Sequence, residues 1–159
     1  MASRRSAGLL LFRRGGAGLE VLLAHPGGPL WARRDAGAWT VPKGEYGPDE
    51  EAVAAARREF AEEMGRPAPP SAELIELGEV RQRGGKIVTA WAAESDFDPS
   101  GVTSNTFEME WPPRSGTRRS FPEIDRAQWF DLPTAREKIL PAQAEFLDRL
   151  AASVRCGDS

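Results

Sequence analysis

The sequence contains few of the residues that mark disulfide-bonded, membrane-spanning or nucleic-acid-binding proteins. Cys156 is the only cysteine among 159 residues, which excludes an intrachain disulfide and a cysteine-based metal cage. The longest strongly apolar run, residues 9–12, is far shorter than a membrane span, and no signal-peptide core follows Arg4 and Arg5. A net charge of −3 provides no overall basic field for a nucleic-acid duplex or an anionic membrane. We therefore expect a cytoplasmic protein that binds neither of them.

The remaining composition is that of an ordinary globular protein. With 40% hydrophobic and 28% charged residues, the chain is neither disordered nor fibrous, and its length fits one domain. We expect this domain to occupy residues 1–159, with a core over about 6–150 and a frayed tail at 153–159. Lysine is also scarce, so Lys43, Lys86 and Lys138 each mark a place where an ammonium group is preferred to a guanidinium.

The hydrophobic pattern predicts strands on both sides of one central helix. Helices are expected at 48–64 and 133–152, where apolar residues recur at helical spacing. Strands are expected at 6–12, 19–24, 39–42, 73–83, 86–94 and 127–132. Residues 96–121 are rich in Pro, Gly and Ser and are expected to form a long irregular loop, which is typically functional. This order of elements predicts a mixed α/β domain with helices packed on a sheet.

The central helix is expected to begin at Pro48, after which acidic residues suit its positive end, and to stop at Gly65. Its buried stripe is predicted to consist of Val53, Ala56, Phe60 and Met64.

Three glutamates share another face of this helix. Glu59, Glu62 and Glu63 have i, i+3, i+4 spacing, and like charges at this spacing destabilise a helix unless water or a cation compensates them. Mg²⁺ and Mn²⁺ prefer oxygen ligands and bridge carboxylates to phosphate oxygens. A glutamate-rich helix face is, however, more often a solvated surface, so the spacing of the whole segment has to decide between the two interpretations.

The whole segment resembles a known family motif. Gly44, Glu50, Arg58, Glu59, Phe60, Glu62, Glu63 and Gly65 fit the pattern G-x5-E-x7-R-E-U-x-E-E-x-G, in which U is a bulky apolar residue. This pattern is the Nudix box, and the chain resembles the Nudix hydrolase family. One position departs from the family pattern, because Arg66 stands where an apolar residue is usual. The departure affects the helix exit and not the carboxylates.

The resemblance implies a Nudix-type α/β/α sandwich with a mixed β-sheet, and it also implies the roles of the box residues. Glu59, Glu62 and Glu63 would coordinate Mg²⁺ or Mn²⁺, and the carbonyl group of Gly44 is a further candidate ligand. The metal ions would neutralise a diphosphate and activate a water molecule. Arg58 would hold Glu62 in place, and Glu50 is expected to support the loop before the helix.

Several residues outside the box are further candidates for the site. Lys43 lies next to Gly44 and is a candidate phosphate contact, with an exposed turn lysine as the alternative. Glu123 precedes a Trp-containing strand, as an additional glutamate does in Nudix enzymes of the dinucleoside-polyphosphate and cap-trimming type, and is our candidate for a further metal ligand or general base. Glu108 and Glu110 compete with it, although an edge strand with one charged face is preferred for them.

Trp39, Trp111 and Trp31 are candidates for stacking a nucleobase, with core packing as the alternative for each. Residues 82–86 are a further polar turn that we expect near the cleft, and His25 is predicted to be a loop residue without a partner.

The sequence therefore predicts a metal-dependent pyrophosphohydrolase. It would use water to cleave a nucleoside diphosphate linked to another moiety, with nucleoside triphosphates or dinucleoside polyphosphates favoured, and it would be a monomer or a homodimer. Two alternatives remain: a non-catalytic Nudix-like module that binds a nucleotide for regulation, and an acidic helix that serves as a protein-interaction surface without metal.

Overall fold

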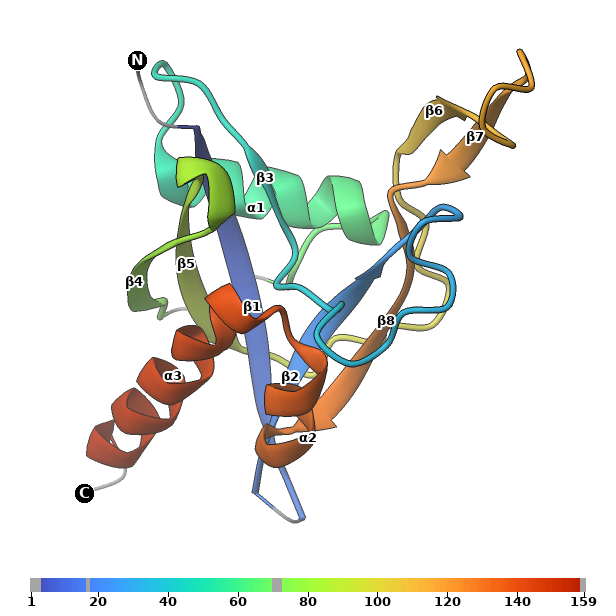
Figure 1. Ribbon diagram of the computed structural model, residues 1–159. Coiled ribbons are helices and arrows are strands. Elements are labelled where there is room, and N and C mark those ends of the chain that lie inside the picture. Colours follow the sequence, from blue (N-terminus) through green and yellow to red (C-terminus); the bar gives the residue numbers. More distant parts are fainter. Residues whose placement is uncertain (1–3, 17, 70–72, 158–159) are drawn as a thin grey trace.

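The computed structural model describes residues 4–16, 18–69 and 73–157, with side chains as far as Val154. Its centre is a six-stranded mixed sheet in the order β4-β5-β1-β2-β8, with β3 paired to β1 (Figure 1). β1 and β5 are parallel and the other pairs are antiparallel. The strands are β1 (Arg5–Gly15), β2 (Gly18–Pro26), β3 (Lys43–Glu45), β4 (Ile75–Arg81), β5 (Ile87–Glu94) and β8 (Ile124–Asp131).

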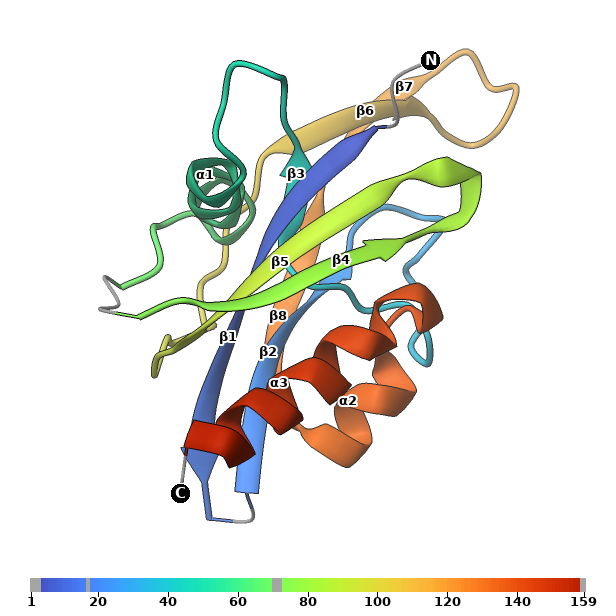
Figure 2. The same cartoon turned by 90° about the vertical axis from the view of Figure 1, so that its left-hand side faces the viewer.

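Helices cover both faces of this sheet. α1 (Ala52–Met64) lies on one face, and α2 (Leu132–Lys138) and α3 (Ala144–Gly157) lie on the other (Figure 2). Two short 3₁₀ turns, η1 (Arg83–Gly85) and η2 (Pro141–Gln143), join β4 to β5 and α2 to α3. None of the described helices is long and apolar enough to cross a membrane. The predicted α/β/α sandwich with a mixed sheet is confirmed.

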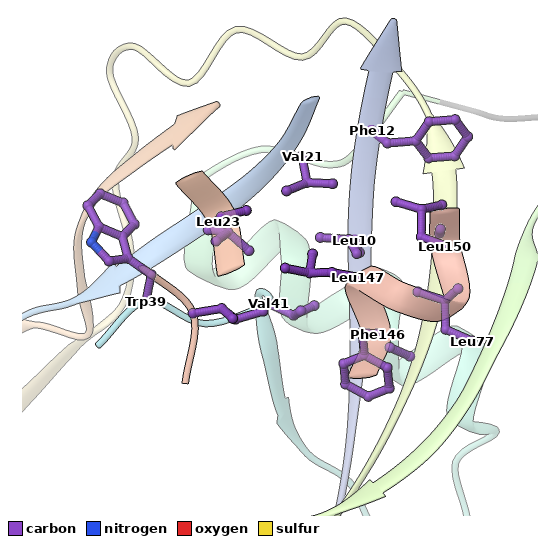
Figure 3. Packing of buried hydrophobic residues seen from close by; sticks show 14 of the residues in the cluster. Leu10, Phe12, Val21, Leu23, Trp39, Val41, Leu77, Phe146, Leu147 and Leu150 are labelled. Atoms are coloured by element: carbon purple, nitrogen blue, oxygen red, sulfur yellow. The ribbon is translucent and has the colours of Figure 1, made fainter. Parts of the chain in front are cut away.

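β1 shows why the sheet is buried on both sides. Successive side chains on a strand point to opposite faces. Leu9 and Leu11 therefore belong to the core under α1, which includes Phe60. Leu10, on the other face, packs in the core under α3 with Phe146, as Figure 3 shows. A strand covered on both faces reads as a nearly continuous apolar run, as residues 9–12 do.

A second, two-stranded sheet lies in the segment that was predicted to be an irregular loop. β6 (Thr106–Glu110) and β7 (Arg118–Pro122) pair antiparallel, with Phe107 opposite Phe121. The hairpin extends from the body of the protein beyond β8 (Figure 1). The alternation of bulky and charged residues indicated an edge strand at Glu108 and Glu110, but the Pro- and Gly-rich composition gave no prediction of β7 or of its pairing with β6. Glu108 and Glu110 thus lie on a strand, as the preferred alternative stated.

The structure corrects the bounds of three other elements. α1 begins at Ala52 and not at Pro48, because Glu51 has an extended backbone (φ −70°, ψ 140°). The predicted strand at 39–42 forms only isolated bridges, from Trp39 to Ile139 and from Thr40 to Ala24, and the strand itself begins at Lys43.

The predicted helix at 133–152 is two helices. Between them Leu140 donates its N–H to the carbonyl group of Trp39, 2.8 Å away, and Pro141 follows. α3 continues to Gly157, into the segment for which a frayed tail is predicted, and residues 158 and 159 lie outside the described chain. The end of α1 agrees with the prediction: Gly65 has φ 83° and donates its N–H to the carbonyl group of Ala61. In the buried stripe Ala55 is buried, whereas Val53 is only half-buried.

Candidate active site

The candidate site forms where β3 passes under α1. Glu59 lies directly over Gly44: a Cβ atom built on Gly44 would be 1.9 Å from Oε2 of Glu59. Real Cβ contacts are never this short, so any side chain at position 44 would displace the carboxylate. The glycine of the box is therefore needed here for close approach of the β3 backbone to the first of the three glutamates.

Arg58 is hydrogen-bonded to three carboxylates at once. Its Nε and Nη2 donate to the two carboxylate oxygens of Glu50 at 2.8 and 2.9 Å. Its Nη1 donates to Glu59 Oε1 at 2.8 Å and to the Glu62 oxygens at 3.2 and 3.3 Å. This planar fork raises the pKa of Arg58 and lowers that of Glu50. The sequence predicted the contact with Glu62, and the structure adds the shorter one with Glu59. Glu50 fixes Arg58 from the loop before the helix.

Glu63 is the most deeply buried carboxylate of the helix. Burial is the main cause that raises its pKa to about 8; the charges of Glu59 and Glu123 contribute to this rise, and the backbone N–H and the ammonium group of Lys43 oppose it. The Lys43 N–H donates to Glu63 Oε1 at 3.2 Å. In the absence of a metal ion this carboxyl group is therefore protonated at neutral pH.

Lys43 is partly buried, in contrast to an exposed turn lysine. Burial lowers the pKa of its ammonium group, as does the nearby charge of Lys86, and Glu63 and Glu59 act in the opposite direction. The structure thus places the lysine within electrostatic reach of the helix carboxylates.

Glu123 joins the helix carboxylates from a distant part of the sequence. It lies between β7 and β8, where its N–H donates to Asn105 O at 2.9 Å and its carbonyl group accepts from Gly27 N–H at 2.9 Å. Asn105 in turn donates its N–H to Glu62 O at 3.3 Å, which ties this junction to the end of α1. Burial raises the pKa of Glu123, and the charge of Glu62 raises it further. The pKa of Glu59 is also raised, chiefly by burial and further by the charges of Glu62 and Glu123, while Arg58 opposes the rise.

The raised pKa values of Glu59, Glu63 and Glu123 show that like charges act on one another in this region, where Arg58 is hydrogen-bonded to Glu59 and Glu62. In the described part of the chain, no three His, Cys, Asp or Glu side chains are arranged as a ready-made metal site. The donor set nevertheless suits a hard divalent cation, because it consists of oxygen atoms whose negative charge a cation would relieve. The residues therefore fit the metal that the box implies.

The competing carboxylates lie elsewhere. Glu108 is exposed and is 3.8 Å from Arg118 across the hairpin. Glu110 accepts the N–H of Arg114 at 2.6 Å. Trp111 directly follows β6, at the turn end of the same hairpin.

Trp39 cannot offer a ring face to a nucleobase. Only 2% of its surface is exposed, its ring meets His25 and Phe130 edge-on, and its Nε1 donates to Asp35. The predicted base-stacking role of Trp39 is therefore wrong, and core packing, the alternative, is what the structure shows. It stays inside because the ring fills the core under α2.

His25 is not the unpartnered loop residue that was predicted. It lies in β2 and is fully buried, with Nδ1 2.9 Å from Asp125 Oδ1 and Nε2 2.6 Å from Arg34 O. The sequence carried no signal for this pairing because Asp125 is 100 residues away.

Two cavities flank these elements. One, of about 270 Å³, includes Trp31 and Glu123 in its wall, and the other, of about 450 Å³, is lined in part by Gln82 and Arg83. Gln82 and Arg83 thus line the second cavity, together with Leu140, Pro141 and Ala142. Gln82 also accepts a hydrogen bond from the buried Gln143.

Comparison with known proteins identifies the class. Residues 2–150 match the family model of the NUDIX domain. The structure is similar to an Ap4A hydrolase of C. elegans (TM-score 0.64, 22% identity, covering 96% of this chain and 98% of that one). It is also similar to the NUDIX domain of NrtR from Shewanella oneidensis, solved with ADP ribose (TM-score 0.64, 16% identity, 97% and 90%). A Nudix hydrolase from M. smegmatis, RenU, gives a TM-score of 0.60 at 23% identity, with 98% and 89% covered. No curated protein matches.

The chain belongs to the Nudix family. Its enzyme class is that of the pyrophosphohydrolases, which hydrolyse phosphoric anhydride bonds.

Proposed function

We propose that this protein is a divalent-metal-dependent pyrophosphohydrolase that cleaves a nucleoside diphosphate linked to another moiety. The observation that carries the proposal is the convergence of Glu123 with Glu59, Glu62 and Glu63, which are 60 or more residues away in the sequence. Carboxylates that raise one another's pKa values at a family motif are typical of a functional site.

Each residue of the site has a distinct task in this proposal. Glu59, Glu62 and Glu63, with the carbonyl group of Gly44, would hold Mg²⁺ or Mn²⁺. Such an ion, when bound, neutralises the diphosphate and lowers the pKa of a bound water molecule, which supplies the attacking oxygen.

Arg58 fixes the orientation of Glu59 and Glu62 through the fork described above, and Glu50 prevents Arg58 from moving away. Lys43 is placed to contact a phosphate oxygen, since a partly desolvated ammonium group interacts more strongly with an anion. Glu123 comes from the junction of β7 and β8 and is our candidate for the base that accepts a proton from the attacking water.

Nucleoside triphosphates and dinucleoside polyphosphates remain the favoured substrates. The similar structures include an Ap4A hydrolase and a NUDIX domain with ADP ribose. Because substrate choice in this fold depends on loops outside the box, both kinds of compound belong in the test.

The test is a substrate panel: ATP, GTP, diadenosine tetraphosphate and ADP ribose, each with Mg²⁺ or Mn²⁺, with products resolved by chromatography. We expect one class to yield a nucleotide and a phosphate-containing product. The exposed Glu51→Gln serves as the matched control for Glu62→Gln, which should lower the rate by about 100-fold. Absence of hydrolysis across the panel, with nucleotide binding retained, would favour the regulatory module.

A second comparison separates Glu123 from its competitors. Glu123→Gln should lower turnover strongly, whereas Glu108→Gln and Glu110→Gln on the outer hairpin should not. The reverse order would move the candidate base to β6.

A further inference from the structure

The cavity of about 270 Å³ is lined by the end of β2 and the segment that follows it, by β6 and by Glu123. Its wall contains Leu30 and Trp31 from the segment after β2, Phe107 and Met109 from β6, and Glu123. Its volume is close to the lower end of ordinary ligand pockets, roughly 300 Å³. The wall residue Glu123 also belongs to the carboxylate cluster of the candidate site. The cavity therefore opens beside the proposed reaction site.

Two consecutive glycines allow the walls of this cavity to approach each other closely. A Cβ atom on Gly27 would lie 2.0 Å from Pro122 O, and one on Gly28 would lie 2.8 Å from the Phe107 ring. Gly28 also has φ 94°, which L-residues rarely adopt. Only glycines allow the chain to pass this close to β6 and β7, so the cavity is a feature built by the sequence and not a gap between loosely packed loops.

The lining is apolar and aromatic, and part of it faces solvent. Among the large hydrophobic residues that the structure describes, Leu30 is the one with an exposed side chain, at 62% exposure. An occupant of the cavity would cover it. Of the described residues that line the cavity, Glu123 alone is charged. Its negative charge disfavours a phosphate group inside, so an occupant would keep its phosphates toward the α1 carboxylates and the cations they hold.

We propose that this cavity binds a nucleobase of the substrate, with Trp31 and Phe107 as aromatic surfaces and Leu30 as an apolar edge. The inference rests on the proposed function for the position of the phosphates. Aromatic stacking accepts every base, because every base has a π-face. Since the lining offers few hydrogen-bonding side chains to read a base edge, binding is tolerant of base identity. The enzyme therefore accepts several nucleosides in this cavity.

The test uses the methionine methyl groups as reporters. The chain has three methionines, of which Met109 lines the cavity and Met64 is buried under α1. In protein labelled with ¹³C-methyl methionine and saturated with diamagnetic Mg²⁺, AMP, GMP, CMP and UMP, which have no anhydride bond to hydrolyse, should each shift the Met109 resonance through ring currents and leave Met64 in place. Ribose 5-phosphate, which has no base, should not shift it. Met109→Leu assigns the signal.

Leu30→Ser is the decisive variant, because an exposed side chain contributes little to folding. Loss of the covered leucine should weaken AMP binding by roughly tenfold. Ser120→Ala, at an exposed position of β7 outside the cavity lining, should leave binding unchanged. Affinities for the four nucleotides should fall within about tenfold of one another.

No shift at Met109 with any of the four nucleotides, or equal binding by Leu30→Ser and wild type, would overturn the proposal. These titrations need no turnover. A protein that binds AMP in this cavity but hydrolyses nothing would therefore contradict the proposed function and leave the cavity proposal standing. A protein that hydrolyses nucleotides without a Met109 shift would sink the cavity alone.

Discussion

Replacing Glu63 by glutamine should abolish a pH dependence of stability that the metal-free protein is expected to show. The pKa of Glu63 is raised from 4.5 to about 8, chiefly by burial. Between these two pH values the folded protein keeps a proton that the unfolded chain has released. The free energy of unfolding therefore falls as pH rises, by up to about 1.4 kcal/mol per pH unit and on the order of 4 to 5 kcal/mol in all. In the Glu63→Gln variant the amide side chain would mimic the protonated carboxyl group, and its oxygen can still accept the N–H of Lys43.

The assay is urea unfolding in EDTA at pH 5 and pH 8.5. Wild type should lose several kcal/mol more than Glu63→Gln over this interval, and the exposed Glu51→Gln should behave as wild type. Parallel losses in wild type and Glu63→Gln would refute the reasoning, because burial would then not be what holds the proton on Glu63.

Three further variants test other parts of the site. Arg58→Lys keeps the charge but loses the two-pronged contact with Glu50, so we expect a 10- to 100-fold lower kcat/KM; an unchanged value would mean that the fork is not needed. Gly44→Ala places a methyl group on the Glu59 carboxylate and should cost about 1–3 kcal/mol of unfolding free energy and weaken Mn²⁺ binding, both measurable by thermal unfolding with and without the ion. As the proposed base, Glu123 must be deprotonated to act, so Glu123→Gln should remove the rise of kcat with increasing pH on the acidic limb of the profile, and a retained acidic limb would exclude that role.

The chemistry of α1 could be predicted from the sequence because its determinants are local. The box glutamates, the arginine and Gly65 lie within one helix and its exit, and helical spacing alone places Glu59 and Glu62 on a common face. The same holds for the hairpin of β1 and β2, whose alternation and turn residues are adjacent in the chain.

Other features depended on contacts between distant residues and could not be predicted. Trp39 and Trp31 look equivalent in sequence, yet one is enclosed by β2, β8 and α2 and the other reaches a cavity. The C-terminal helix is divided because Leu140 bonds to Trp39, about a hundred residues earlier. His25 acquired two partners through the pairing of β2 with β8.

The hairpin of β6 and β7 shows a different kind of failure. The alternation of Phe107 to Glu110 indicated one strand, but residues 118–122 show no such alternation and follow a turn of Pro, Gly and Ser, so the partner strand was not predicted. Missing this hairpin also hid the cavity, because one of its walls is β6.

The central claim is that the carboxylate cluster hydrolyses a phosphoric anhydride with the help of a divalent cation. The most direct measurement follows diadenosine tetraphosphate and ATP in H₂¹⁸O, with wild type and Glu62→Gln, in Mn²⁺ and in EDTA. We predict that wild type forms products carrying one ¹⁸O in Mn²⁺ only, and that Glu62→Gln is slower by about 100-fold or more. Equal rates in EDTA, or equal rates in the variant, would contradict the account.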